Sequence, residues 1–135
     1  MILVDTSVWI DFFRKSPTPE SRTLHSLLEQ DELLAITGLI FAEILQGVRD
    51  GKSLEKVKRA LGVLTILDPS SLATYEAAAG IYRSCRARGA TIRSLVDCVV
   101  EAIAIENKIL VLQKVRDCLE IAKNSGLNLY PDLLP

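Results

Sequence analysis

The sequence predicts a three-layer α/β fold in which a central parallel sheet of four to five strands is covered by helices on both faces. Short apolar runs such as Ile2–Val4 have the length and composition of strands that are buried on both sides. These runs alternate with longer stretches of helical periodicity, which is the order that a parallel sheet with crossover helices requires. The chain has 135 residues without an internal repeat or linker, so we expect a single domain over residues 1–135.

The first half of the chain contains two expected strand–helix units and a helical hairpin. Apolar residues from Val8 to Phe13 are dense enough for a packed helix. Thr18 suits the N-cap of the next helix, since the proline that follows it is preorganised for a first turn. Gly38 interrupts the second strand, and Ser53 can cap the last helix of this half. Strands are expected at residues 2–4 and 33–37, and helices at 8–13, 19–30, 39–49 and 53–62.

The second half continues the alternation of strands and helices. Asp68 and Pro69 end the third strand, because proline cannot donate to a central strand ladder. Gly89 stops an Ala-rich helix, and Ser94 opens a very apolar one. Strands are expected at residues 64–67 and 108–112, with a last strand at 127–130, and helices at 72–88, 94–106 and 115–123.

The composition excludes several classes of function. The net charge is −1, so binding to nucleic acid would require a local basic patch or a metal. The chain has one histidine, His25, and three cysteines without C-x-x-C spacing, which argues against zinc sites, disulfide frameworks and histidine-based triads. There is no secretory signal, and the apolar stretch 95–105 contains two acids and is too short to span a bilayer. We therefore expect a cytoplasmic protein without a membrane segment.

Asp5 follows the first strand directly and precedes the first helix. This order places a carboxylate at the carboxyl end of a strand, where ligands bind in open α/β sheets. An alternative is that Asp5, Thr6 or Ser7 only caps the helix, because these residue types all lead the N-cap preferences.

Glu43 interrupts an apolar helical run at residues 39–45. A carboxylate on or beside an apolar face needs a partner, because an unpaired buried charge is costly. The alternative is a boundary residue that faces solvent or pairs with Arg49.

Asp97 lies near the start of the apolar helix 94–106, one turn before Glu101. Two acids on one helix face repel each other unless a cation lies near them, which favours a metal-binding role for Asp97. The alternative is a capping box, in which the carboxylate of Asp97 reaches back to the Ser94 amide.

Asp117 lies in the first turn after the fourth strand, where an acid is favourable with the helix dipole regardless of function. Asp5 also follows a strand, Asp97 begins a helix that leads into one, and Glu43 lies just past the second strand. The four carboxylates can therefore meet at one carboxyl edge of the sheet. Oxygen-only ligands favour Mg²⁺ over zinc, and Mn²⁺ can substitute for it. A metal held there could bind a phosphate oxygen and activate water.

Four segments together show a family resemblance: Val4-Asp-Thr-Ser-Val-Trp-Ile-Asp11, Phe41-Ala-Glu-Ile-Leu-Gln-Gly47, and Gly89-Ala-Thr-Ile-Arg-Ser-Leu-Val-Asp97 with Ala102-Ile-Ala-Ile-Glu106. In these segments the sequence resembles the PIN-domain ribonucleases and, more narrowly, the VapC-type toxins of toxin–antitoxin systems. The resemblance covers essentially the whole chain in order and length.

The resemblance implies a PIN-like fold and an endoribonuclease that hydrolyses phosphodiester bonds in RNA of the tRNA or rRNA class. It implies that Asp5, Glu43 and Asp97 coordinate Mg²⁺, with Asp117 as a further acid of the same catalytic site. Thr6 would steady this cluster through its hydroxyl. The family also implies a homodimer and inhibition by a cognate antitoxin.

The turn after the fourth strand departs from the family pattern. Such toxins have two acids two residues apart, followed by an aromatic residue, and these positions are Val115, Asp117 and Cys118 here. The missing acid leaves open whether one or two metal ions bind. It also motivates an alternative function, in which the chain is a non-catalytic or weakly active RNA- or antitoxin-binding module. A small-molecule phosphatase is disfavoured, because no Asp-x-Asp follows a strand.

Arg86 and Arg93 flank Gly89 and lie close in sequence to Asp97. Their guanidinium groups could bind RNA phosphates beside the metal. The alternative is that the arginines around the end of helix 72–88 only complement the negative end of its dipole.

Overall fold

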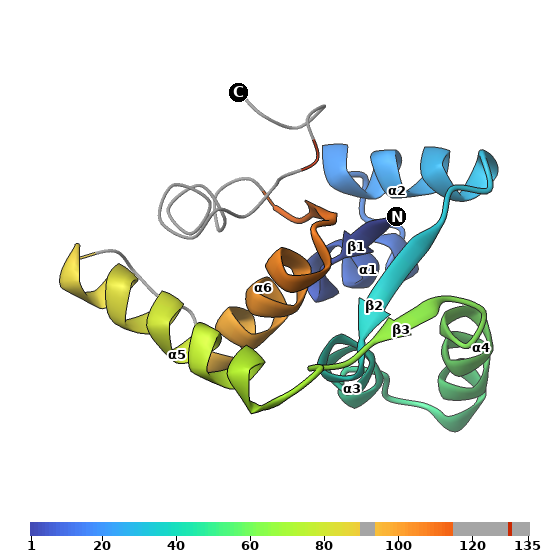
Figure 1. Ribbon diagram of the computed structural model, residues 1–135. Coiled ribbons are helices and arrows are strands. Elements are labelled where there is room, and N and C mark those ends of the chain that lie inside the picture. Colours follow the sequence, from blue (N-terminus) through green and yellow to red (C-terminus); the bar gives the residue numbers. More distant parts are fainter. Residues whose placement is uncertain (90–93, 115–129, 131–135) are drawn as a thin grey trace.

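The structure, a computed structural model, describes residues 1–89, 94–114 and 130 (Figure 1). Its described part contains a parallel four-stranded sheet in the order β3-β2-β1-β4, which confirms the expected α/β class. The strands are β1 (Ile2–Val4), β2 (Leu34–Thr37), β3 (Thr65–Leu67) and β4 (Leu110–Leu112). The helices are α1 (Thr6–Phe13), α2 (Pro19–Glu29), α3 (Gly38–Gln46), α4 (Gly51–Leu61), α5 (Leu72–Ala87) and α6 (Leu95–Asn107).

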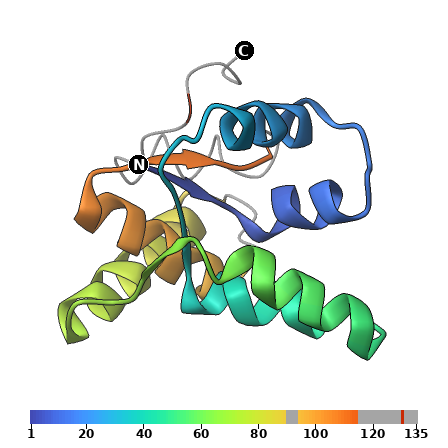
Figure 2. The same cartoon turned by 90° about the vertical axis from the view of Figure 1, so that its right-hand side faces the viewer.

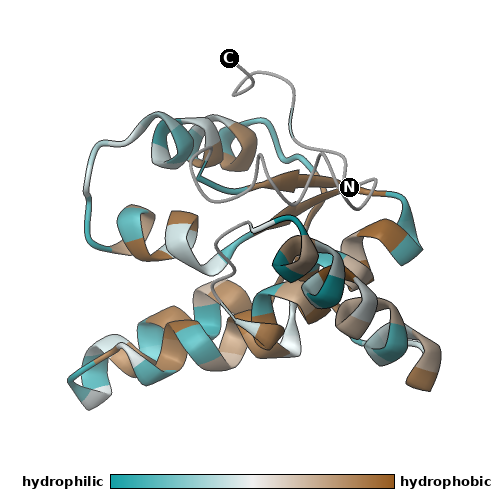
Figure 3. Cartoon of the chain, turned by 90° about the vertical axis from the view of Figure 1, so that its left-hand side faces the viewer, coloured by the Kyte–Doolittle hydropathy of each residue, from teal (hydrophilic) through white to brown (hydrophobic). Residues whose placement is uncertain are grey.

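Helices cover both faces of the sheet, as Figure 2 shows for α2 on one side and the α5–α6 pair on the other. Coloured by hydropathy, the strands are apolar, whereas the helices alternate apolar and polar stretches (Figure 3). This is the pattern expected when strands are buried on both faces and helices on one. None of the helices in the described part of the chain is long and apolar enough to cross a membrane.

The core consists of two clusters of buried side chains. The larger one surrounds the central strands, where Leu3, Val4 and Ile36 have no exposed surface. The smaller one lies between α5 and α6 and includes Ala78 and Ile103. The edge strand β3 is only partly covered, since Ile66 is 45% exposed.

Most helix boundaries follow the local signals in the sequence. Thr18 caps α2 through a reciprocal pair of hydrogen bonds with Ser21, and Ser94 caps α6 by accepting from the Asp97 amide at 3.2 Å. The helix expected at 39–49 ends earlier, at Gln46, and Gly47 follows as its C-cap.

The expected cap of α4 was wrong. Asp50, rather than Ser53, is the N-cap, and its Oδ1 accepts a hydrogen bond from the Ser53 amide at 2.8 Å. An aspartate in extended backbone can reach the amide three residues on, so the helix begins at Gly51. Hydrogen bonds from the backbone and side chain of Ser53 lower the pKa of Asp50 below its ordinary value.

The last expected elements lie almost entirely outside the described residues. These are the helix at 115–123 and the strand at 127–130, of which the structure describes only Tyr130. The backbone N–H of Tyr130 donates to the Val111 carbonyl at 2.9 Å, which places Tyr130 beside β4.

Candidate active site

Asp5 lies at the carboxyl end of β1 and is 7% exposed. Its Oδ2 accepts hydrogen bonds from the Ser7 hydroxyl at 2.9 Å and the Ser7 amide at 3.4 Å. Asp5 is therefore the N-cap of α1, as the alternative interpretation proposed. Capping does not exclude a second role, because a carboxylate has about four lone-pair sites for hydrogen bonds or a metal.

Thr6 connects the beginning of α1 with α3. Its Oγ1 donates to Glu43 Oε1 at 3.0 Å, across 37 residues of sequence. Glu43 is partly buried, in a helix that packs against α1. This hydrogen bond offsets part of the desolvation cost of placing the Glu43 carboxylate beside an apolar face. Asp5 and Glu43 are thus held by two adjacent hydroxyl residues of one turn.

Asp97 is partly buried in the first turn of α6. Its Oδ2 accepts from the Ser94 hydroxyl at 2.9 Å, so the carboxylate reaches back to the side chain of Ser94. Because α6 leads into β4 and β4 runs parallel to β1, the start of α6 lies toward the carboxyl edge of the sheet. Asp5 lies at this same edge.

The start of α6 has a negative electrostatic environment. Burial is the main cause that raises the pKa of the Cys98 thiol to about 11, and the nearby Cys85, Asp97 and Glu101 add to it. Glu101 lies one turn after Asp97 and is 2% exposed. A cation would be favourable beside these acids.

Not every predicted site residue can be placed. Asp117 and Arg93 lie outside the described residues. Within the part that the structure describes, no three acids, histidines or cysteines lie close enough to hold a metal ion together. The predicted ligands Asp5, Glu43 and Asp97 offer only oxygen donors, which is the donor type that fits Mg²⁺ or Mn²⁺.

Arg86 lies in the last turn of α5 and is exposed. Its guanidinium carbon is 5.8 Å from the centroid of the Tyr82 ring, so it stacks over an aromatic face of its own helix. The position suits the negative end of the α5 dipole, and it also leaves the guanidinium near solvent.

Comparison with known proteins identifies the family. A model of the PIN domain matches residues 2–123. The chain is 33% identical over 128 residues to a VapC ribonuclease of Mycobacterium bovis and to ribonuclease VapC11 of Mycobacterium tuberculosis. These alignments cover 94% of this chain and 96% of each relative. The chain belongs to the PIN-domain family of VapC ribonucleases. The predicted family membership is thereby confirmed.

Solved structures share the fold of this VapC-family chain. VapBC2 from Rickettsia felis, bound to a DNA fragment from its promoter, has a TM-score of 0.73 at 18% identity and covers 96% of this chain and 98% of its own. VapBC-1 from nontypeable Haemophilus influenzae also has a TM-score of 0.73, at 15% identity, with 96% and 97% covered. FitAcB from Neisseria gonorrhoeae has a TM-score of 0.65 at 22% identity, with 96% of both chains covered.

Two residues at the edge of this VapC-family sheet were not predicted as part of the site. Asp68 follows β3, and its Oδ1 lies only 3.0 Å from where a Cβ on Gly38 would be. Gln113 follows β4 and is 3% exposed. Asp68 could have been found from the sequence, because it directly follows a strand as Asp5 does. Nothing in the sequence around Gln113 indicates that it is buried.

Proposed function

We propose that the protein is a Mg²⁺-dependent endoribonuclease that acts as the toxin of a toxin–antitoxin pair. The observation that supports this most is the link between Asp5 and Glu43 at the carboxyl edge, made by the consecutive hydroxyl residues Thr6 and Ser7. Membership of a ribonuclease family supports the reaction class. We propose RNA of the tRNA or rRNA class as the substrate.

In this proposal Asp5, Glu43, Asp97 and Asp117 hold the ion, and Mn²⁺ can replace it. When bound, Mg²⁺ would polarise a phosphate oxygen and lower the pKa of a water molecule. The residues of the chain fix the geometry: Ser7 holds one oxygen of Asp5, and Thr6 holds one oxygen of Glu43. Arg86 and Arg93 would bind the RNA backbone through phosphate contacts, which position the substrate without reading its sequence.

The deciding experiment is cleavage of total tRNA and rRNA by the purified protein with Mg²⁺, with and without EDTA. We expect discrete products that EDTA abolishes. Val115, at a position where such toxins have an acid, favours a second candidate: a non-catalytic or weakly active RNA- or antitoxin-binding module. Binding of RNA or antitoxin without metal-dependent cleavage would establish this second function instead.

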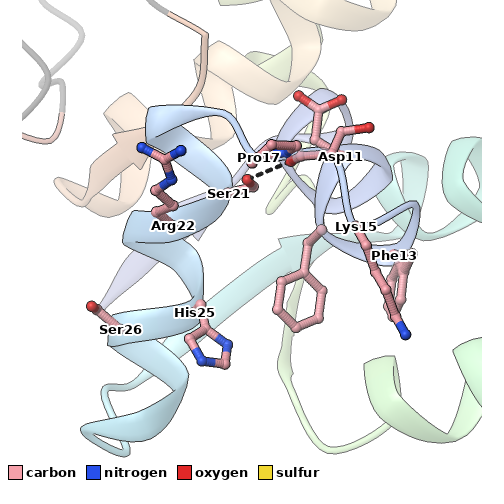
Figure 4. A pocket seen from close by; sticks show the side chains of 10 residues that line it. Asp11, Phe13, Lys15, Pro17, Ser21, Arg22, His25 and Ser26 are labelled. Atoms are coloured by element: carbon pink, nitrogen blue, oxygen red, sulfur yellow. Dashed lines mark hydrogen bonds between the residues drawn. The ribbon is translucent and has the colours of Figure 1, made fainter.

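We also propose that a cognate antitoxin covers the acidic site. The solved structures with this fold include a toxin–antitoxin complex from Klebsiella pneumoniae, with a TM-score of 0.68. Two hollows adjoin α1 in this chain. One, of about 700 Å³, lies between α1 and α2, where Phe13 and His25 line it from opposite sides (Figure 4). The other, of about 690 Å³, lies between α1, α3 and α4 and is called the α1–α3–α4 groove below.

The α1–α3–α4 groove has an apolar floor and a mostly basic rim. The buried or partly buried lining residues, which form the floor, are Ile10, Phe13, Ile44, Val48 and Val57, and the exposed charged lining residues, which form the rim, are Arg14, Lys15, Arg49, Asp50 and Lys56. This combination suits an amphipathic antitoxin helix with acidic flanks. A basic side chain of the same antitoxin could reach the carboxylates of the acidic site. Trp9 lies in the same helix as Phe13 but is 2% exposed and belongs to the core, so it does not contribute to a docking surface.

Co-expression with the neighbouring open reading frame should give a stable complex with suppressed nuclease activity. Val48→Asp should weaken that complex, because it places a charge in the apolar floor of the groove. Val63→Asp is the matched control, since Val63 is 84% exposed and does not line the groove. Equal loss of the complex in both variants would contradict the groove as the docking site.

We further propose that the protein is a cytoplasmic homodimer. Light scattering during size-exclusion chromatography, with and without the antitoxin, would measure the mass of the assembly. A monomer at concentrations where the protein is active would contradict this part of the proposal.

A further inference from the structure

Gln113 is a buried polar residue next to Asp5. The backbone pairs Val4 with Leu112 in register, and the Asp5 amide donates to the Leu112 carbonyl at 3.0 Å. The ladder therefore continues by one step, to Asp5 and Gln113. Side chains in register on neighbouring strands extend to the same face of a sheet, so these two lie on one face at the carboxyl edge. Gln113 is 3% exposed, comparable to the 7% of Asp5.

The amide nitrogen of Gln113 has no hydrogen-bond partner among the residues that the structure describes, although it is buried. Leaving such a donor unsatisfied is costly, and native proteins contain few of them. The next residue differs: Lys114 forms an ion pair with Asp11 at 2.9 Å, which ties the end of β4 to α1. Gln113 Nε2 is thus a buried hydrogen-bond donor at the carboxyl edge of the sheet, and it has no acceptor among the described residues.

We propose that Gln113 Nε2 donates a hydrogen bond to a non-bridging phosphate oxygen of the bound RNA and orients the phosphodiester beside Asp5. This inference rests on the proposed ribonuclease function. An amide nitrogen has no lone pair for a metal, so its partner must be an acceptor. A phosphate oxygen is an acceptor, and a neutral donor offsets the repulsion between phosphate and carboxylates without displacing the cation.

The test compares Gln113→Met with wild type. Methionine has a similar length and no polar group, so the metal-free variant should melt at the same temperature as wild type or higher. The affinity for tRNA, measured by filter binding with Ca²⁺ in place of Mg²⁺, should fall about tenfold or more. Gln30→Met makes the same change at an exposed residue at the end of α2 and should alter neither value.

A second variant separates hydrogen bonding from packing. Gln113→Glu has the same shape but no donor, and its charge repels phosphate, so it should weaken tRNA binding more than Gln113→Met. A Gln113→Met protein that melts at a lower temperature and binds tRNA like wild type would overturn the inference, because the amide would then be structural. RNA cleavage by the wild-type protein is tested independently. If the wild-type protein does not cleave RNA but its tRNA binding still depends on Gln113, the proposed enzymatic function is rejected and the proposed contact between Gln113 and phosphate is supported.

Discussion

The two ends of α6 each contain an acid that accepts hydrogen bonds from hydroxyl groups, yet these hydroxyl donors lie at very different distances along the chain. At the start, Asp97 accepts from Ser94, the N-cap three residues before it. At the end, Glu106 accepts from Ser70 and from Thr74, the latter at 2.9 Å, and this joins the beginning of α5 to the end of α6.

Hydroxyl–carboxylate hydrogen bonds alone therefore do not identify a functional acid. Glu106 lies one turn before β4 begins, and its partners fasten one helix to another. Asp97 lies at the other end of the helix, toward the edge where β1 delivers Asp5. In a parallel sheet, the carboxyl edge is where ligands bind, so the position in the topology supports the proposed metal-binding role for Asp97 and not for Glu106.

The largest expected effect is that of Asp5→Asn, which should reduce RNA cleavage by more than about 100-fold, because loss of an outer-shell partner alone costs about 10–100-fold. Asparagine is as good an N-cap as aspartate, so α1 should persist. The melting temperature without metal should be unchanged or higher, since one negative charge is removed from the acidic edge. Cleavage assays and calorimetry measure the two effects.

Glu106→Gln is the matched control for Asp5→Asn. It removes a charge from the other end of α6 and should leave cleavage at the wild-type rate. Full cleavage by Asp5→Asn at limiting Mg²⁺, or strong loss of cleavage in Glu106→Gln, would contradict the assignment of the metal site to the carboxyl edge.

A smaller effect is expected for Thr6→Val, which removes the hydrogen bond to Glu43 and keeps the shape of the side chain. Cleavage should fall about tenfold, in the range seen when a partner of a metal ligand is lost. The Mg²⁺ concentration for half-maximal cleavage should rise, and Thr6→Ser should restore it. If Thr6→Val needs no more Mg²⁺ than wild type, Glu43 is not a ligand.

Val115→Asp adds an acid to the chain, whereas Asp5→Asn removes one. It restores an acid where VapC-type toxins have one, so it should tighten metal binding and raise the cleavage rate severalfold. Before this change, cleavage should be slow and faster with Mn²⁺ than with Mg²⁺, since Mn²⁺ binds such sites more tightly. Calorimetric titration with Mn²⁺ measures the affinity, and an unchanged affinity and rate would show that Val115 is peripheral.

The smallest effect is a pH-dependent loss of stability in Glu106→Gln. Hydrogen bonds from Ser70, and then Thr74, lower the pKa of Glu106 below its ordinary 4.5. Its ionised form therefore stabilises the fold above pH 4.5, and this contribution is lost as the pH falls through the lowered pKa. The variant should melt below wild type at pH 7, and the two curves should converge in acid. A difference that grows on acidification would contradict this.

Most element boundaries and the class of fold follow from local sequence. The apolar run Ile2–Val4 and the caps Thr18 and Ser94 act over a few residues, so their structural consequences can be read from neighbours in the chain. The cap of α4 shows the limit of such signals, because Asp50 and Ser53 are both good caps and only the backbone conformation selects between them. The candidate acids Asp5, Glu43 and Asp97 could also be named from the sequence, since each is an acid in an apolar context.

Which of these residues lie near each other depends on the tertiary structure. The order β3-β2-β1-β4 brings the ends of β1 and β4 together, although more than 100 residues of sequence separate Asp5 from Gln113. The Thr6–Glu43 hydrogen bond likewise depends on how α1 and α3 pack, and the burial of Trp9 depends on the packing of α1 into the core. A strand's apolar pattern specifies that it is buried, but not which strand lies beside it or in what register, because those depend on packing between distant segments.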